Sequence, residues 1–235
     1  MSKTIAIMQP YFLPYIGYWQ LMNAVDQFVV YDNIQFTKRG WINRNRFLLN
    51  GKVETFTLPL KKDSDYLDVR ERYLKDDFYV EAKKLIRRFE AAYKIAPYYK
   101  EGIEILEKCL FYEENNLFKF IFNSIQVIKS YIGIETRLVI SSEISIDHRL
   151  RSSDKVKAIC NNLGANCYVN PIGGIALYDK NDFNKSNITL KFIQTHYFSY
   201  QQISESFVPC LSIIDIIMNC SKFEITSLIT KFSDR

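Results

Sequence analysis

The sequence is poor in the side chains on which many metal and acyl-transfer sites depend. It has two histidines in 235 residues, His148 and His196. This excludes a histidine-rich zinc site and leaves only these two residues for a Ser–His or Cys–His dyad. The five cysteines are an odd number without a CxxC pair, so we expect neither a zinc finger nor a disulfide framework. We predict no metal site.

Long hydrophobic runs are also missing. No apolar stretch approaches the roughly 18 residues that a transmembrane helix needs. The short run near Met1 leads directly to Gln9 and Pro10, not to the small residues of a signal-peptide cleavage site. We therefore expect a cytoplasmic protein with no membrane partner. The net charge of +5 is too small to predict a DNA-binding protein, which carries a clustered basic face.

Aromatic side chains are abundant, with 16 tyrosines and 17 phenylalanines. Hydrophobic residues make up 48% of the chain and charged residues 24%, and this length suffices for a sizeable core. We predict one α/β domain spanning residues 1–235. Most aromatic rings are expected to fill that core, whereas those of the first twenty residues favour a pocket that stacks on sugars or bases.

The first thirty residues predict a βαβ unit. Residues 4–8 and 28–31 are apolar runs without alternation, which is typical of buried parallel strands. Between them, a loop stiffened by Pro10 and Pro14 leads into a helix with a regular apolar face. Such a unit predicts a Rossmann-like, mostly parallel sheet with right-handed crossovers.

The rest of the chain predicts a helical insertion and then further α/β units. Helical periodicity runs over about residues 74–133 and ends at Gly133 as a C-cap. Asn50-Gly51 predicts a hairpin turn within residues 47–60, and residues 61–70 are expected to be a charged, solvent-exposed connector. The remaining predicted elements are strands at 138–140, 167–169 and 188–192, a helix capped by residues 152–154, and a terminal helix at 212–218.

Three polar segments follow predicted strands, at the end of the sheet where ligands bind in open α/β folds. They are residues 9–18, 32–46 and 170–179. Glycine and proline in the third segment favour a backbone that approaches a ligand closely, although a plain turn fits as well. We expect the three segments to form the walls of a single crevice.

The middle segment has the chemistry of a phosphate clamp. Lys38, Arg39, Arg44 and Arg46 lie within nine residues, and guanidinium groups match phosphate oxygens. Trp41 lies among them and favours a ligand site, because a tryptophan is costly to leave in water. The alternative is a basic surface loop.

The first βαβ unit resembles that of nucleotidylyltransferases and pantothenate-synthetase-like ligases. Their HxGH turn begins a helix at which nucleotide phosphates bind, and Tyr15-Ile16-Gly17-Tyr18 has the corresponding spacing. Asn33-Ile34-Gln35-Phe36 likewise resembles their NPxQF stretch. Both histidines are replaced by tyrosine, which carries no positive charge at neutral pH. ATP with Mg²⁺ therefore stays one of several options for activating a substrate.

A second resemblance covers nearly the whole chain. It is carried by the segments QPYFLPYIGYWQLM (9–22), YDNIQFTKRGWINRN (31–45), NPIGGIALYD (170–179) and FVPCLSIIDIIMN (207–219). Together they resemble the WbqC-like protein family, which occurs in bacterial gene clusters for O-antigen and other surface polysaccharides. The family is described as transferring glycine, or more broadly aminoacyl groups, to amino sugars.

The resemblance points to particular residues when it is carried over motif by motif. It implies these substrate-binding residues: Tyr11, Gly17, Gln35, Lys38, Arg39, Trp41, Arg44, Asn45, Asn170, Gly173, Gly174 and Tyr178. It also marks Ser212 and Asp215 in the last segment. Cys210 is expected to be a small buried hydrophobe and not a nucleophile.

The resulting hypothesis is an enzyme that forms an amide on the amino group of a nucleotide-linked, preferably dTDP-linked, dideoxy-amino sugar. The predicted catalytic residues are Gln9, Tyr18, Asp32, Asn43, His148 and Asp179. Backbone N–H groups, Gln9 or Asn43 would stabilise the tetrahedral oxyanion. Asp32, His148 or Asp179 would accept the proton of the amine. Lys38, Arg39 and Arg44 would hold the diphosphate.

Several alternatives remain open from the sequence. The acyl donor is activated in place by ATP, or arrives as a CoA thioester or an aminoacyl-tRNA. A non-catalytic sugar-nucleotide-binding protein of the same pathway, with a degenerate nucleotidylyltransferase-like fold, is the main alternative to an enzyme. An RNA-binding module rests only on basic residues interleaved with aromatic ones. Exposed aromatic residues also favour a homodimer.

Overall fold

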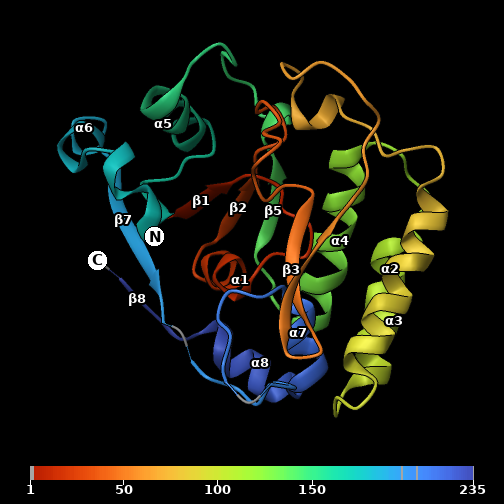
Figure 1. The fold of residues 1–235 in the computed structure, drawn as a ribbon. Coiled ribbons are helices and arrows are strands. Elements are labelled where there is room, and N and C mark those ends of the chain that lie inside the picture. Colours follow the sequence, from red (N-terminus) through yellow and green to blue (C-terminus); the bar gives the residue numbers. More distant parts are fainter. Residues whose placement is uncertain (1–2, 197, 205, 235) are drawn as a thin grey trace.

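A six-stranded sheet organises the computed structural model, which describes residues 3–196, 198–204 and 206–234. The strand order is β5-β2-β1-β6-β7-β8 (Figure 1). The parallel strands are β1 (Thr4–Met8), β2 (Gln27–Val30), β5 (Arg137–Ile140), β6 (Cys167–Pro171) and β7 (Thr189–Thr195). Only β8 (Phe232–Asp234), at the edge of this sheet, is antiparallel. The predicted Rossmann-like, mostly parallel α/β arrangement is confirmed.

The central strands lack polar alternation because both faces of the sheet are covered. Ala6, Phe28 and Val30 point into one hydrophobic core, while Ile7 and Val29 point into a second. The second core is closed by α5 (Ser152–Asn162) and α6 (Lys180–Asn184). The first and larger core is closed by α1 (Ile16–Asn23) and the remaining helices. Continuous apolar runs are the pattern expected for strands buried on both sides.

The region predicted to be a helical insertion contains three helices. They are α2 (Phe78–Tyr93), α3 (Tyr99–Leu110) and α4 (Leu117–Ile132), the last ending at Gly133 with a positive φ of 76°. The hairpin of β3 (Arg44–Leu49) and β4 (Lys52–Thr57) turns at Asn50-Gly51, as predicted. Phe47 of this hairpin stacks on Phe89 of α2, with ring centroids 4.6 Å apart.

Three expectations about local structure are corrected. The helix expected to be terminal is α7 (Ile213–Asn219), and it is followed by α8 (Lys222–Ile229) and β8. A capping box between Ser221 and Glu224 begins α8, and this sequence signal was overlooked because the neighbouring apolar run dominates. Helix α5 starts at Ser152 itself, so Arg151 occupies the N-cap position.

The third correction concerns the connector at 61–70, which is not simply exposed. Its last residues lie antiparallel to residues 32–36 through backbone hydrogen bonds such as Phe36 N–H to Leu67 C=O, 2.9 Å, and Val69 N–H to Ile34 C=O, 2.9 Å. Val69 is buried in the larger core. Backbone pairing therefore holds the charged residues 68–72 against the segment that follows β2.

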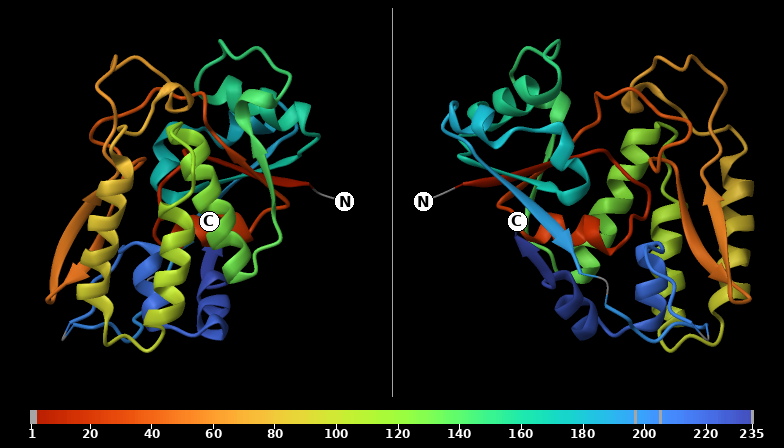
Figure 2. Two further views of the ribbon diagram at one scale, coloured as in Figure 1. Left: turned by 90° about the vertical axis from the view of Figure 1, so that its right-hand side faces the viewer. Right: turned by 60° about the vertical axis from the view of Figure 1, so that its left-hand side comes forward.

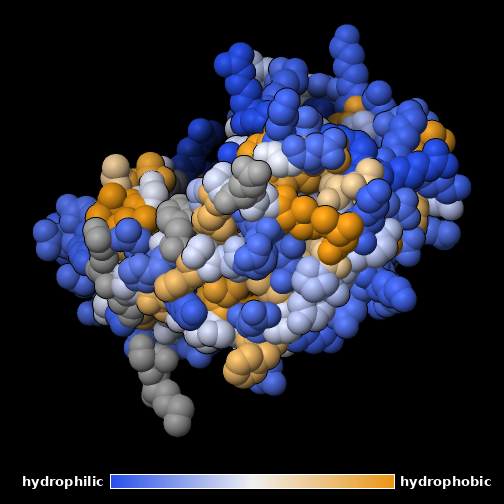
Figure 3. Space-filling view, turned by 60° about the horizontal axis from the view of Figure 1, so that its bottom comes forward, coloured by the Kyte–Doolittle hydropathy of each residue, from blue (hydrophilic) through white to orange (hydrophobic). Residues whose placement is uncertain are grey.

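The face at the bottom of Figure 1 combines apolar patches with hydrophilic side chains (Figure 3). Exposed hydrophobic residues of the chain include Ile95 and Phe223. Over the described residues, no helix combines the length and the apolarity needed to cross a membrane.

A buried carboxylate ties the C-terminal segment to the helices and the hairpin. Asp215 of α7 accepts hydrogen bonds from the hydroxyl of Tyr93 (2.7 Å), the hydroxyl of Tyr200 (2.5 Å) and the side-chain amide of Gln202 (3.1 Å). The Tyr93 oxygen also accepts the backbone N–H of Leu48 in β3 at 3.2 Å. The carboxylate thus joins four separate chain segments.

Removing the Tyr93 hydroxyl should destabilise the fold. Tyr93→Phe leaves the Leu48 N–H and one Asp215 oxygen short of a buried partner, so the free energy of unfolding should fall by about 1–3 kcal/mol. Tyr66→Phe is the matched control, because Tyr66 is 86% exposed. Urea unfolding followed by circular dichroism measures both, and equal unfolding midpoints would contradict the role of this network.

Candidate functional site

The strand order reverses at β1, which lies between β2 and β6. From β1 the chain winds outward to β2 and β5, then returns to the other side of β1 to form β6 and β7. Ligands in open α/β sheets bind at such a reversal of strand order. The segments after β4 and after β5 both lie at this end of the molecule, drawn in orange and green in Figure 2.

Six polar or charged residues, which we call the strand-end cluster, gather there: Tyr31, Asp32, Asn33, Asp68, His148 and Lys155. Asp32 is 2% exposed, and its Oδ1 accepts the backbone N–H of Ser142 at 2.9 Å. Asn33 Nδ2 donates to His148 Nδ1 at 2.9 Å. The segments after β2 and β5 are therefore linked side chain to side chain.

Lys155 lies buried beneath the exposed His148. It is 5% exposed, its Nζ donates to the backbone carbonyl of His148 at 3.4 Å, and the same atom lies 4.8 Å from the centre of the Tyr31 ring. Burial lowers the pKa of Lys155 below its usual value, while Asp68 and Asp32 act in the opposite direction. Burial likewise raises the pKa of Asp68. An ammonium group is thus held at low solvent exposure against the backbone of His148 and the ring of Tyr31.

The third polar segment adds an amide to the same edge of the sheet. Asn170 is buried at the end of β6, and its Oδ1 accepts the hydroxyl of Tyr168 at 3.2 Å. It lies directly over Gly174, which is buried, whereas Gly173 is exposed. Half-buried Tyr178 packs edge-on against Tyr168, and exposed Asp179 caps α6.

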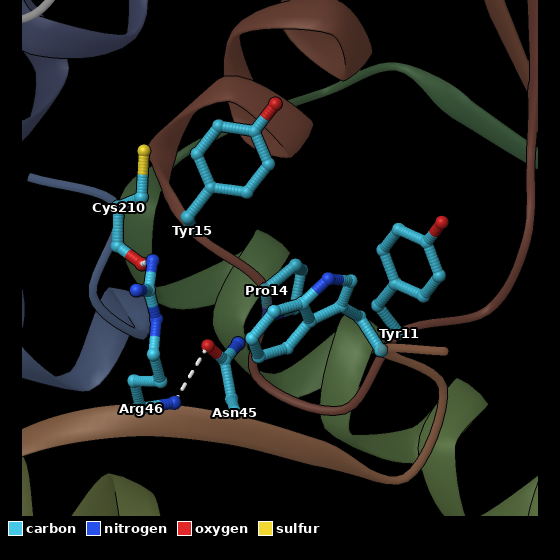
Figure 4. Close-up of a pocket in the computed structure, with 7 residues that line it drawn as sticks. Tyr11, Pro14, Tyr15, Asn45, Arg46 and Cys210 are labelled. Atoms are coloured by element: carbon cyan, nitrogen blue, oxygen red, sulfur yellow. Dashed lines mark hydrogen bonds between the residues drawn. The ribbon is translucent and has the colours of Figure 1, made fainter. Parts of the chain in front are cut away.

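The first two polar segments meet around a pocket of about 160 Å³, which we call the aromatic pocket. Tyr11, Pro14 and Tyr15 precede α1 on one side, while Asn45 and Arg46 lie on β3 and Cys210 comes from the C-terminal loop (Figure 4). Trp41 also lines this pocket. The guanidinium carbons of Arg44 and Arg46 lie 5.3 and 5.4 Å from its ring. Flat apolar walls edged by cations suit a stacked aromatic ring.

Several predicted site residues hold the backbone of these loops. The side-chain amides of Asn43 and Asn45 donate to the carbonyls of Leu58 (2.8 Å) and Leu13 (2.7 Å). The Tyr18 hydroxyl is buried and donates to the Gln9 carbonyl at 3.3 Å. Any side chain at Gly17 would collide with the ring of Tyr15 and with Thr195 of β7. The Gln35 amide donates to the Asp65 carbonyl at 2.9 Å, and Lys38 forms an ion pair with the Asp65 carboxylate at 2.7 Å. The guanidinium of Arg44 donates to the carbonyls of Gly40 and Arg39.

The structure distributes the predicted residues over more than one place. No residue of segment 170–179, all of which the structure describes, lines the aromatic pocket. That segment lies at the strand ends with Asp32 and His148, while exposed Arg39 and half-buried Gln9 belong to the other two segments. Lys38, Asn43 and Arg44 line a further cavity together with residues 57–63.

Three residues of the strand-end cluster, Tyr31, Asp68 and Lys155, were missed by the sequence reasoning, and Tyr31 had been assigned to the strand that ends there. Lys155 is in the first turn of a helix that follows a strand, a position at which a buried charge can be suspected. Asp68 is in the connector whose pairing with residues 32–36 has no local sequence signal. Asn33 was noted only as part of a motif.

Comparisons with known proteins agree with the segments singled out above. The sequence profile of the WbqC-like protein family matches residues 9–227. The chain belongs to the WbqC-like protein family.

The chain is also 29% identical over 220 residues to the uncharacterized protein Rv1507c of Mycobacterium tuberculosis (strain ATCC 25618 / H37Rv), covering 92% of this chain and 94% of that protein. No solved structure matches the chain significantly. Membership suggests a role in surface-polysaccharide biosynthesis and is consistent with an enzyme.

The two glycines after β6 should respond differently to alanine. A Cβ at Gly174 would overlap Asn170 Nδ2, so the amide must move and Tyr168 loses its acceptor. Gly174→Ala should therefore cost about 1–3 kcal/mol of stability. Gly173→Ala is the control, because nothing lies within 4 Å of a Cβ there.

Thermal unfolding of the two alanine variants provides the measurement. The double variant Gly174→Ala/Asn170→Ala should be no less stable than Asn170→Ala alone, since no amide remains to be displaced. Identical melting temperatures for Gly173→Ala and Gly174→Ala would show that Asn170 is not held as described.

Proposed function

We propose that this protein transfers an acyl or aminoacyl group, such as glycyl, to the amino group of a nucleotide-linked amino sugar in surface-polysaccharide biosynthesis. One observation carries the proposal. The imidazole of His148 is positioned by the amide of Asn33, and the buried ammonium of Lys155 donates to the backbone carbonyl of the same histidine, at the carboxyl ends of a parallel sheet. A proton acceptor beside a fixed positive charge is what amide formation needs.

In the proposed reaction, the sugar amine attacks the carbonyl carbon of the acyl donor and forms a tetrahedral oxyanion. His148 accepts the amine proton through Nε2 and returns it to the leaving group as the carbon–leaving-group bond breaks. Lys155 stabilises the negative charge of the oxyanion. The products are the amide and the protonated leaving group.

The orientation of the Asn33 amide decides which imidazole nitrogen is basic. With Nδ2 facing His148, Nδ1 accepts and the imidazole proton is on Nε2. Asn33 Oδ1 is buried with no hydrogen-bond partner. Turning the amide by half a rotation lets Oδ1 accept from Nδ1–H, which frees Nε2 as the base. We assign the proton-accepting state to this second orientation.

Asp32 and Asp68 have a supporting role in this proposal. Both favour the charged form of Lys155 against the cost of its burial. Asp32 Oδ1 is engaged by the Ser142 backbone, so His148 is the better proton acceptor of the two. Asp179, which caps α6, is the least suited because its Oδ1 accepts the Asn181 N–H at 2.7 Å.

The nucleotide part of the sugar-nucleotide acceptor is proposed to bind toward the aromatic pocket. Its rings at Tyr11, Tyr15 and Trp41 suit a flat base, and Arg44 and Arg46 supply positive charge at its edge. A dTDP-linked substrate fits this combination of apolar wall and cation.

ATP, which the HxGH-like turn implied, does not fit the residues present at that turn. The Tyr18 hydroxyl is buried and engaged with the Gln9 carbonyl, and Tyr15 is hydrogen-bonded to Thr195. Neither phenol offers the positive charge that a phosphate needs. The proposed mechanism therefore contains no ATP-dependent step, and a CoA thioester or an aminoacyl-tRNA is the preferred donor.

Replacing the proposed base should abolish turnover and leave the fold intact. His148→Ala should lower kcat by about 10²–10⁴-fold, the usual contribution of a general base. His196→Ala is the matched control, because His196 is exposed beyond the end of β7. Mass spectrometry of the amide product measures both, starting from a dTDP-amino sugar with glycyl-CoA, glycyl-tRNA, or glycine and ATP.

Two outcomes of that assay contradict an acyl transferase. If wild-type protein binds the dTDP-amino sugar in calorimetry but forms no product with any donor, the non-catalytic binding protein is the correct alternative. If it neither binds the sugar nucleotide nor forms product, both the acyl transferase and the sugar-nucleotide-binding protein are excluded.

The charge of Lys155 should set the alkaline limit of activity. Because burial lowers its pKa below the ordinary 10.5, the ammonium is lost, and kcat falls, as the pH rises through that lowered value. In Lys155→Arg the guanidinium stays charged, so activity should persist to higher pH, while Lys155→Met should lose activity at every pH. Coincident alkaline limbs for wild type and Lys155→Arg would exclude this role.

A further inference from the structure

A second cavity, about 340 Å³ in volume and separate in its lining from the strand-end cluster, has five cations among its twelve lining residues. It lies between residues 36–44, the end of the hairpin and the following connector. Its basic lining residues are Lys38, Arg44, Lys61, Lys62 and Arg72, and its acidic one is Asp63. We call it the basic pocket. Such an excess of positive charge within one concave surface attracts anions.

Two of these cations already have surface partners. Lys38 Nζ lies 2.7 Å from the Asp65 carboxylate, and Lys61 Nζ lies 2.6 Å from that of Asp76. Ion pairs of this exposed kind contribute little and exchange readily. They leave Lys38 and Lys61 available to a ligand with a stronger charge.

Arg72 is different, because it is buried without a carboxylate. It is 4% exposed, and within the described part of the chain no acidic group forms an ion pair with it. Its terminal nitrogens donate to the carbonyls of Ser64 (2.7 Å) and Lys61 (3.3 Å), while its Nε has no partner. The guanidinium lies 5.0 Å from the centre of the Phe36 ring. Neutral carbonyls and an aromatic face position this charge but do not neutralise it.

Burying a cation without a counter-charge costs free energy of desolvation unless a bound anion neutralises it. We propose that the basic pocket binds a phosphate or diphosphate group, with Arg72 as its fixed determinant and Lys62 as an outer contact. The planar fork of arginine matches two phosphate oxygens, and stacking on Phe36 sets the plane of the fork. This deepens the proposed function and rests on it in one respect: the natural ligand is then the diphosphate of the sugar nucleotide.

Calorimetric titration tests the pocket without any turnover. Inorganic diphosphate and dTDP should bind wild-type protein, and thymidine should bind much more weakly. Arg72→Met should weaken dTDP binding by at least about tenfold, the value of one charged hydrogen-bonded contact. Lys62→Ala should weaken it severalfold. Lys52→Ala is the control, because Lys52 lies on the β3–β4 hairpin but outside the cavity, and it should leave dTDP binding unchanged.

Arg72→Lys guards against a variant that fails to fold. It keeps the charge and loses the planar fork, so its dTDP affinity should fall between those of wild type and Arg72→Met. Wild-type protein that ignores both diphosphate and dTDP would overturn the proposal, as would unchanged affinity in Arg72→Lys and Lys62→Ala. Binding of single-stranded RNA in preference to dTDP would also overturn it. Because only binding is measured, failure here leaves the acyl-transfer proposal to its own assay.

Discussion

β1 is hydrogen-bonded in parallel to β2 along one edge and to β6 along the other, and the functional end of the molecule depends on these two pairings. A parallel pair needs a crossover: the chain crosses from β1 to β2 on one side and later crosses from β5 to β6 on the other side of β1. Because these strands are parallel, the loops after β1, β2 and β6 begin at the same edge of the sheet. Buried apolar side chains on both faces keep the central strands rigid.

The segment at residues 67–72 transmits that rigidity to two charged sites. It is paired with the backbone after β2, so Asp68 is held close enough to influence Lys155 while Arg72 is held in the basic pocket. Both cations are nearly inaccessible to water, and each is balanced differently. Lys155 has carboxylates nearby, whereas Arg72 has carbonyls and an aromatic ring. A short paired segment thus places a fixed ammonium and a fixed guanidinium at the same end of the fold.

Much of this fold could be predicted from the sequence because its signals are local. Unbroken apolar runs indicated the buried strands, Asn50-Gly51 the hairpin and Gly133 the end of α4. Helix α8 and strand β8 were not predicted, because the strongly apolar residues 212–218 dominate the pattern there and obscure the capping signal at Ser221. The same local reasoning selected Asp32 and His148 as candidates, since they directly follow a strand or precede a helix.

What sequence reasoning could not supply is the pairing of segments that are distant in the chain. Arg72 and Lys155 resemble surface residues in their local context, and only the contacts with residues 32–36 and with His148 make them buried. Conversely, Asn43 and Asn45 were selected as polar residues in a ligand loop, and their amides support backbone carbonyls. The sequence alone does not distinguish a polar side chain that supports the backbone of such a loop from one that faces a ligand.

The central claim is that the amino group of a sugar nucleotide is brought to His148 at the carboxyl ends of the parallel sheet. A crystal structure of the protein with a dTDP-linked amino sugar measures this directly. The account predicts that the amine nitrogen lies within hydrogen-bond reach, about 3 Å, of His148 Nε2. A sugar nucleotide bound elsewhere, with its amine facing solvent and His148 untouched, would contradict it.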